Sequence, residues 1–205
     1  MARESRPIVK LSRREGYALH PKAHKALVKR PGPPGQRGNY NGRQKNSQYS
    51  LQLREKQKVK RLYGLLERQF SKLMEEASRT HGQSGATLLE FLERRLDNVI
   101  YRAGFAPSRN SARQLSTHGH FLLNGKRVDI PSIRVKAGDK IELREASKKT
   151  EYFKQLDEVS PAPANQPTWL SINRKKVSVE ISGNPTRDEA EPDIKEQLIV
   201  EYYSR

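Results

Sequence analysis

A cluster of cationic side chains in the middle of the chain could do chemistry. Arg109 and Arg113 are four residues apart and therefore project from the same face of a predicted helix. An Asn124-Gly125 pair, typical of a type I′ hairpin, follows and is itself followed by two further cations. Such a compact basic platform on a rigid scaffold suits the phosphates and 2′-hydroxyl groups of folded RNA. A basic helix face that is merely solvated is the alternative interpretation.

The overall charge of the chain also indicates a polyanionic partner. The 205 residues contain 40 Lys+Arg and 23 Asp+Glu, a formal net charge of +17. Residues 1–60 hold 16 of these basic residues and only 3 acids. Hydrophobic residues make up 34% of the chain, where about 45–50%, glycine included, is usual. We therefore expect part of the chain to be an extended arm that becomes ordered on a partner, with nucleic acid favoured over a membrane surface.

Several classes of protein are excluded by what the sequence lacks. It contains no cysteine, which excludes disulfides, thiolate zinc sites and a cysteine nucleophile. No apolar stretch approaches the roughly 18 residues that span a bilayer, and no signal peptide is visible at the N-terminus. We expect a protein that works inside a cell or an organelle, without contact with a membrane.

No enzyme signature is found. The chain has neither a glycine-rich loop ending in Gly-Lys-Ser/Thr nor a Gly-x-Ser-x-Gly elbow. The triplet Arg95-Leu96-Asp97 is similar to the one around the nucleophilic aspartate of some pseudouridine synthases, but it lies inside a predicted helix and no catalytic domain of adequate length follows. We expect Asp97 to have a structural role, such as pairing with a nearby arginine. The protein is predicted not to be an enzyme and to take no small-molecule substrate.

The first half of the chain is predicted to be helical. Residues 1–48 are interpreted as a basic arm with one or two short helices and a Pro/Gly-rich middle. An apolar stripe at spacings of three and four begins after Tyr49, with Gly64 as a possible division, and residues 81–85 end it. Thr87 is a plausible N-cap of an amphipathic helix that closes at Gly104. Ser108 can cap a second helix that ends near His118 and Gly119.

Short strands are predicted after these helices. Residues 121–123 and 126–128 flank the hairpin turn, and residues 133–135 and 141–143 alternate like strands. Further alternation occurs over 169–172 and 177–181, where Trp169 is interpreted as a core residue. The apolar C-terminus, residues 198–203, must pack on another part of the protein.

These motifs resemble a known family. The pattern Ser-Arg-x-x-Ala-Arg-x-Leu at residues 108–115, followed by the Asn-Gly hairpin, resembles the small RNA-binding module named after ribosomal protein S-four. Residues 54–58, 92–99 and 196–205 are similar to the whole small-subunit ribosomal protein S-four family of bacteria and organelles. The resemblance covers almost the full chain, with several long motifs in the same order.

The resemblance implies an α+β fold. A mainly helical domain, made of the N-terminal part and a returning C-terminal tail, would carry an inserted S-four-type module of two helices followed by a small antiparallel sheet. We assign residues 1–48 to the basic arm, residues 49–86 plus 155–205 to the helical ribosomal domain, and residues 87–150 to the module.

The resemblance also implies a function. The family consists of structural constituents of the small ribosomal subunit that bind the five-prime domain of its ribosomal RNA early and so nucleate assembly of the subunit body. With neighbouring small-subunit proteins, the family lines the messenger RNA entry path and influences translational accuracy. The protein would then work in the ribosome, in the cytoplasm or, if organellar, in the matrix or stroma.

We expect basic side chains of the arm, the following helix and the module to contact RNA. The predicted set is Lys10, Arg13, Arg14, Arg37, Arg43, Lys45, Arg54, Lys58, Arg61, Arg95, Arg102, Arg109, Arg113, His118, Lys126 and Arg127. For His118, a surface position without RNA contact is an equal alternative. Tyr40 and Tyr49 could stack on bases or serve only in packing.

No metal or cofactor is predicted. Part of the family carries a four-cysteine zinc knuckle near the N-terminus, but Val9 and Ser12 stand where its first cysteine pair would be expected. His20 and His24 are four residues apart, yet no carboxylates complete a ligand set. A stand-alone RNA-modifying or stress-related module protein remains as the alternative, which the helical domain and the tail disfavour. A DNA-binding protein is also disfavoured because no recognition helix or dimer seam is apparent.

Overall fold

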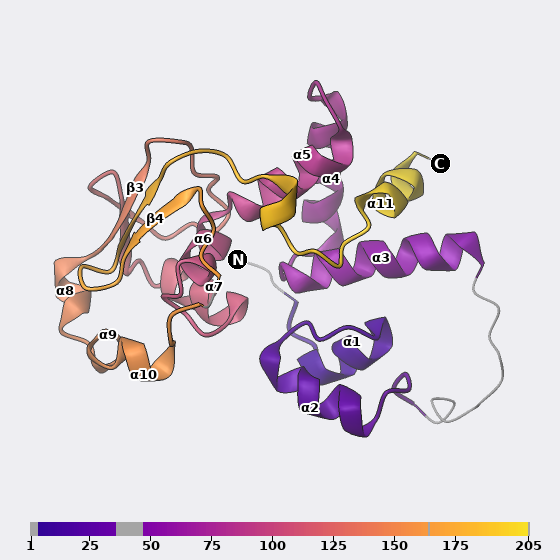
Figure 1. The fold of residues 1–205 in the computed structure, drawn as a ribbon, viewed down its shortest axis with the longest axis horizontal. Helices are drawn as coiled ribbons and strands as arrows, with labels where there is room; N and C mark the ends of the chain where they lie inside the picture. Colours follow the sequence, from indigo (N-terminus) through magenta and orange to yellow (C-terminus); the bar gives the residue numbers. More distant parts are fainter. Residues whose placement is uncertain (1–3, 36–46, 164, 205) are drawn as a thin grey trace. The chain divides into compact units, whose positions relative to one another are not determined.

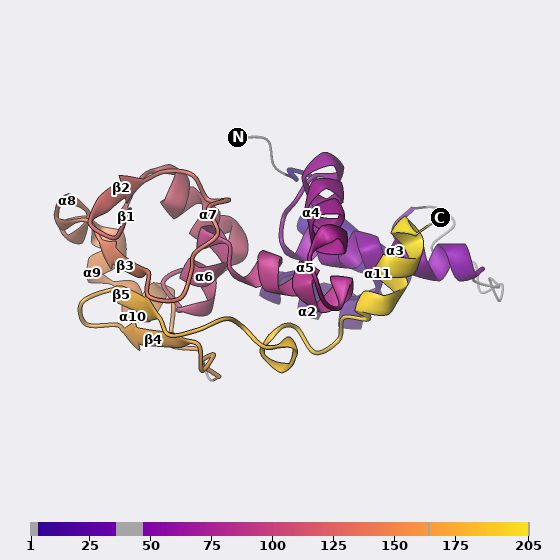
Figure 2. The same cartoon turned by 90° about the horizontal axis from the view of Figure 1, so that it is seen from above.

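The computed structural model describes residues 4–35, 47–163 and 165–204. The chain divides into two compact units (Figures 1 and 2). Unit 1 comprises the residues up to Leu88 together with those from Asp193 onward, and unit 2 comprises Leu89–Pro192. None of the described helices is long and apolar enough to cross a membrane.

Unit 1 is built around a long helix, α3 (Gln48–Leu62). The hydroxyl group of Ser47 accepts the backbone N–H of Ser50 and so caps its N-terminus. Gly64 (φ 65°) then turns the chain into α4 (Glu67–Arg79), as the sequence predicted. Val59, Phe70 and Met74 are buried in the core of this unit.

Two short helices precede α3 and belong to the same unit. They are α1 (Ile8–Glu15), closed by Gly16 in a left-handed conformation, and α2 (Pro21–Lys29). α1 packs on α2 and on α3 (Figure 1), and Leu11 and Ala23 are buried. This part of the expected basic arm is therefore folded onto the helical unit, because its few apolar residues face a common core.

The C-terminal helix α11 (Glu196–Tyr203) returns to α3, as the resemblance implied (Figure 1). Ile199 is fully buried, and the rings of Tyr49 and Tyr202 lie 5.8 Å apart. The Gln52 side chain donates a hydrogen bond to Glu201 (2.7 Å). The apolar tail thus completes the core of unit 1.

Unit 2 begins with a feature that the sequence did not reveal. A single helix from Thr87 to Gly104 was expected, but the structure has α5 (Ser84–Glu93) and α6 (Leu96–Arg102). Arg95 between them is extended and forms a β-bridge with Arg134. The backbone of residues 94–97 bonds to residues 131–135 instead of continuing the helix. These tertiary bonds break the helix, and they replace the strand predicted over 133–135 by one isolated bridge.

The start of α5 also differs from the expectation. The helix begins at Ser84, so Thr87 lies inside its first turn and is not its N-cap. The Thr87 hydroxyl group donates to the carbonyl oxygen of Gln83 (3.1 Å). A glycine in the interior, Gly85, lies where an added Cβ would approach the Glu196 side chain to 2.7 Å. Close packing of α11 therefore explains why glycine is tolerated in this helix.

The second helix and the hairpin agree with the sequence. Ser108 caps α7 (Arg109–Thr117) by accepting the backbone N–H of Ser111. Strands β1 (Phe121–Leu123) and β2 (Lys126–Val128) pair antiparallel, and Asn124 (φ 50°) and Gly125 (φ 78°) both have the positive φ of a type I′ turn.

The sheet of unit 2 contains five antiparallel strands in the order β2-β1-β3-β5-β4. The other three strands are β3 (Lys140–Leu143), β4 (Leu170–Asn173) and β5 (Ser178–Ile181). Short helices α8 (Glu145–Lys148), α9 (Glu151–Lys154) and α10 (Leu156–Val159) follow β3. Residues of α6, α7, the sheet, α9 and α10 form one apolar cluster, which includes Trp169 as predicted.

The boundaries between the parts differ from those assigned from the sequence. Residues 155–205 were grouped with the helical domain, whereas β4 and β5 extend the module's sheet and only the chain from Asp193 belongs to unit 1. Pairing of β5 with β3 explains the difference, because it links residues that are about 40 positions apart in the chain. The short 3-10 turn η2 (Arg187–Glu189) lies in the remaining segment of unit 2.

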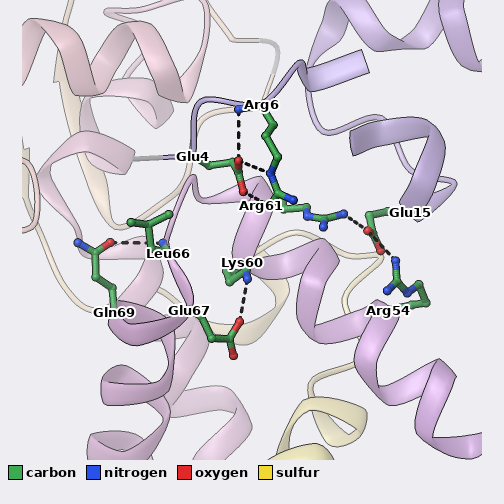
Figure 3. Close-up of polar contacts among 9 residues, drawn as sticks. All are labelled: Glu4, Arg6, Glu15, Arg54, Lys60, Arg61, Leu66, Glu67 and Gln69. Atoms are coloured by element: carbon green, nitrogen blue, oxygen red, sulfur yellow. Dashed lines mark hydrogen bonds and ion pairs between the residues drawn. The ribbon is translucent and has the colours of Figure 1, made fainter. Parts of the chain in front are cut away.

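Glu67 at the start of α4 links three helices of unit 1. Its carboxylate accepts a hydrogen bond from Lys60 of α3 (2.7 Å), which Figure 3 shows. It also accepts hydrogen bonds from Lys56 of α3 (2.7 Å) and from the Tyr203 hydroxyl group of α11 (3.0 Å). Burial alone would raise the pKa of Glu67, but these hydrogen bonds outweigh it and lower the pKa from 4.5 to about 2. Burial and the neighbouring carboxylate raise the pKa of Tyr203.

This shift predicts an acid-dependent loss of stability. A carboxylate whose pKa is lower in the folded protein stabilises it fully above pH 4.5 and progressively less as the pH falls towards 2. We expect Glu67→Gln to lower the free energy of unfolding by about 1 kcal/mol at pH 7, since the side chain is half exposed. The difference from the wild type should vanish near pH 2, as measured by urea unfolding followed by circular dichroism. Glu75→Gln, which breaks an exposed pair on the same helix, is the control, and a pH-independent effect of Glu67→Gln would contradict the prediction.

Candidate nucleic-acid interface

Asp97 is the centre of a buried ion-pair cluster in unit 2. Its carboxylate accepts two hydrogen bonds from Arg95 (3.0 and 2.8 Å) and one from Arg113 of α7 (3.0 Å). All three side chains are less than a tenth exposed. The predicted pairing of Asp97 with a nearby arginine is therefore confirmed. The cluster fixes the break between α5 and α6 and connects it to α7.

Two of the expected RNA contacts thus lie inside the protein. The sequence placed Arg109 and Arg113 together on an exposed face, but Arg113 is directed into the buried cluster. Arg95 is likewise buried. It lies at the break between α5 and α6 and not on the face of one continuous helix. The structure gives both side chains a scaffolding role, and this correction moves the candidate interface to other residues.

Arg102 and Arg109 form a second, more accessible ion-pair network. Arg102 donates twice to Glu93 (2.9 and 2.7 Å), whose carboxylate also accepts from Asn98 (2.7 Å). Arg109 donates to the Asn98 side chain (2.9 Å) and to Glu191 (2.7 Å). Both arginine side chains are between a tenth and a fifth exposed. They are pre-oriented at the surface of unit 2.

The β1–β2 hairpin presents the exposed cations of unit 2. Lys126 and Arg127 are both exposed, and no carboxylate among the described residues forms an ion pair with either. Arg127 lies over Gly119 (φ 69°), where an added Cβ would come within 2.6 Å of its Nε atom. The absence of a side chain at Gly119 therefore lets the hairpin cation rest against the end of α7.

His118 directly precedes Gly119, over which this hairpin cation lies. It is exposed, and its ring centroid is 5.9 Å from that of His120. The pKa of His120 is lowered by its burial and then by the positive charges of His118 and Arg144. The end of α7 therefore brings His118 and His120 together near the exposed hairpin cation Arg127.

The predicted residues of the N-terminal helices differ in accessibility. Lys10 and Arg14 of α1 are exposed. Arg13 is half-buried and donates hydrogen bonds to the carbonyl oxygens of Arg30 and Gly32 (both 3.1 Å). It therefore holds the Pro/Gly-rich turn against α1. The predicted residues Arg37, Arg43 and Lys45, together with Tyr40, lie outside the described residues.

Glu15 engages two of the predicted cations of α3 (Figure 3). Arg61 is buried and paired with Glu15, whose carboxylate also accepts from Arg54 (3.3 Å). Burial raises the pKa of Glu15 and lowers that of Arg61, although each charge opposes the effect on the other. Arg61 therefore fastens α1 to α3 and is corrected to a scaffolding residue, whereas Arg54 remains partly exposed.

Lys58, the third predicted cation of α3, joins the start of the C-terminal segment to this helix. Its ammonium group pairs with Glu55 (2.8 Å) and donates to the carbonyl oxygen of Asp193 (2.7 Å). It is therefore already engaged within unit 1.

The sequence analysis missed one cationic surface of unit 1. Lys22, Lys25 and Lys29 lie at positions i, i+3 and i+7 of α2 and are all exposed. In the described part of the chain no acidic group pairs with them. The spacing of three and four residues, which was applied to the helix at 109–113, would have identified this face too.

The described residues contain no group of three or more His, Asp or Glu side chains that could hold a metal ion. The Nδ1 atom of His20 instead accepts the backbone N–H of Lys22 and caps α2 (3.1 Å). This histidine thus has a structural role in the helix terminus.

Comparison with known proteins identifies the family. Residues 3–93 match the family described as "Ribosomal protein S4/S9 N-terminal domain", and residues 94–141 match the "S4 domain". The chain is 50% identical over 206 residues to the small ribosomal subunit protein uS4 of Roseiflexus castenholzii and 50% identical over 211 residues to that of Clostridioides difficile, with the full length of each chain covered. The chain belongs to the uS4 family.

The family matches can be placed on the elements described above. The S4 domain match covers α6, α7, β1 and β2, and the buried cluster around Asp97 lies within it. The protein is a structural constituent of the small ribosomal subunit and not an enzyme.

The buried cluster predicts a large effect of one uncharged substitution. Asp97→Asn would remove the carboxylate that pairs with both buried arginines, Arg95 and Arg113, which should lower the free energy of unfolding of unit 2 by about 3 kcal/mol. Urea unfolding followed by the fluorescence of Trp169, the only tryptophan, reports on this unit. Asp129→Asn, at an exposed position, should change the value by less than about 0.5 kcal/mol. Equal stability of the two variants would refute the scaffolding role of Asp97.

Proposed function

We propose that this protein is a primary ribosomal RNA-binding protein that nucleates assembly of the small-subunit body. The proposal rests on the observation that the basic side chains fall into an internal set and an exposed set. Buried or paired arginines hold the fold together. A separate set of lysines and arginines on both units is exposed and forms no ion pair with a carboxylate among the described residues. Exposed cations on a rigid scaffold neutralise phosphates at little entropic cost.

The proposed contact residues follow from this division. Lys10, Arg14, His118, Lys126 and Arg127 remain from the sequence-based set, and Lys22, Lys25 and Lys29 are added. Arg37, Arg43 and Lys45 stay proposed as part of the basic arm. Arg13, Arg54, Lys58, Arg102 and Arg109 are engaged in internal contacts but retain some exposed surface, so they would make secondary contacts. Arg61, Arg95 and Arg113 would act by positioning the others.

Cations on both units explain how binding could nucleate assembly. A protein that contacts two parts of one RNA turns the second contact into an intramolecular event and raises the affinity accordingly. The bound RNA would be held in the arrangement that allows both contacts, which favours its folded form for later proteins. Because A-form RNA hides the edges of its bases in the major groove, recognition would depend mainly on shape.

The finer placement in the ribosome rests on the family resemblance. We propose that the RNA is the five-prime domain of the small-subunit ribosomal RNA, and that the protein lies with neighbouring small-subunit proteins beside the messenger RNA entry path. From there it would influence translational accuracy. The relatives are bacterial, which favours a ribosome in the cytoplasm over one in an organelle matrix or stroma.

The hairpin cations provide a direct test. Lys126→Ala combined with Arg127→Ala should weaken binding to small-subunit ribosomal RNA about ten-fold and flatten the slope of log affinity against log salt by about 2. The control replaces Lys175 and Lys176, two exposed cations in the β4–β5 turn of the same sheet. Filter binding at several salt concentrations gives both quantities. An equal loss in the control pair would remove the hairpin from the interface.

Association with the ribosome is tested in a native lysate. On a sucrose gradient, the protein should sediment with the small subunit and remain there after a wash at moderate salt, as expected of a core constituent. Immunoblotting of the fractions gives the distribution, with a known soluble enzyme as the marker for the top of the gradient. A protein found mainly at the top would revive the alternative of a stand-alone RNA-binding protein.

A further inference from the structure

The carboxylate of Glu191 lies beside the guanidinium groups of Arg102 and Arg109, where a bound anion could take its place. One oxygen of its carboxylate lies 2.7 Å from Arg109 and 3.6 Å from Arg102. Arg102 is already neutralised by Glu93 (2.7 Å), a fully buried carboxylate. Glu191 is therefore a second, more exposed anion placed between two arginines that are held in position without it.

A pocket adjoins the same arginine. Its volume is about 260 Å³, and Arg102 and Asn165 are polar groups in its lining. Its apolar and aromatic walls are formed by Tyr101, Ala106, Pro107, Pro161 and Pro163. The hydroxyl group of Ser160 in its lining is used internally, because it donates to the carbonyl oxygen of Gly104 (2.9 Å). The pocket thus offers mainly apolar and aromatic surface with polar groups of two residues.

Two side chains connect the pocket and the ion pair. Tyr101 lines the pocket, and its ring lies 4.6 Å from the Arg109 guanidinium carbon, in cation–π geometry. Arg102 lines the pocket and also approaches Glu191. An anion held by Arg102 and Arg109 would therefore lie next to the pocket opening.

We propose that this place binds one unstacked nucleotide of RNA. The base would enter the pocket against Tyr101 and the three prolines, and its phosphate would replace the Glu191 carboxylate on Arg109 and Arg102. This inference rests on the proposed RNA-binding function and names a nucleotide subsite within it. Glu191 acts as an internal substitute for the phosphate while the protein is free.

The chemistry favours a nucleotide over other ligands. Unpaired bases in RNA loops and bulges are recognised by stacking on aromatic or guanidinium planes, and their phosphates by arginine. Both elements occur here side by side. A purely apolar peptide would leave the two guanidinium groups unused, whereas exchange of one anion for another keeps them paired throughout.

The carboxylate is tested with a matched pair of variants on the same segment. Glu191→Gln should tighten binding of the full chain to small-subunit ribosomal RNA by at least about three-fold, because the competing anion is gone. Asp188→Asn removes the same charge at an exposed position and should have a much smaller effect. Filter binding at constant salt measures both. If both variants changed the affinity for RNA equally, the loss of one negative charge would explain the result, and the proposed role of Glu191 would be wrong.

The pocket is tested separately. Asn165→Trp places a large ring at the pocket, whereas Gln166→Trp places it at the next, exposed residue, which does not line the pocket. A uridine decamer carrying one 4-thiouridine, crosslinked under ultraviolet light, should label the peptide around Tyr101 in the wild type and in Gln166→Trp, and at least about five-fold less in Asn165→Trp. Labelling that is unchanged in Asn165→Trp would overturn the base subsite.

The outcomes separate this inference from the proposed function. If the wild type binds small-subunit ribosomal RNA with a steep salt dependence but Glu191→Gln equals Asp188→Asn and the crosslink is absent, only the nucleotide subsite fails. If the wild type binds that RNA no more tightly than transfer RNA at the same salt concentration, the proposed function itself fails.

Discussion

The need to neutralise buried positive charge governs this structure. An unpaired guanidinium group inside a protein costs far more than hydrogen bonds return, so each buried arginine must have a carboxylate beside it. Asp97 does this for Arg95 and Arg113, and Glu15 does it for Arg61. In a chain with only 23 acidic residues against 40 basic ones, the placement of each buried acid determines which cations become scaffold and which remain at the surface.

The consequences are visible at the helix break before α6. Arg95 can reach Asp97 while its backbone bridges to Arg134, so the local sequence gives up helical hydrogen bonds for tertiary ones. The cluster then holds α7, and α7 in turn supports the hairpin through the contact of Arg127 with Gly119. The orientation of the exposed cations therefore depends on interior charges that are almost fully shielded from solvent.

Patterns confined to one segment predicted the structure well. The Ser108 cap, the Asn124-Gly125 turn, the division at Gly64 and the structural role of Asp97 are all present. The predictions that were wrong concern features that depend on residues far away in the sequence. The helix across Arg95 looked continuous because its apolar spacing is regular, and the bonds that interrupt it come from residues 131–135. Likewise, nothing local distinguishes the buried Arg113 from the more accessible Arg109, because the difference lies in which carboxylate each one meets.

The need to pair buried charges also explains why so many arginines of an RNA-binding protein form contacts within the protein. Arginine suits buried pairs because its planar guanidinium group donates several hydrogen bonds in fixed directions, as the contacts of Arg95 and Arg102 illustrate. Lysine, with its strongly hydrated ammonium group, is better placed on exposed faces such as that of α2. A scaffold whose internal charges are already paired loses little further freedom when the surface cations meet phosphate, so more of the electrostatic attraction is available for binding. Glu191 shares features of the internal ion pairs and of the surface cations, because it is paired with an arginine but is partly exposed. Under the proposal above, a phosphate could replace its carboxylate without a rearrangement of the fold.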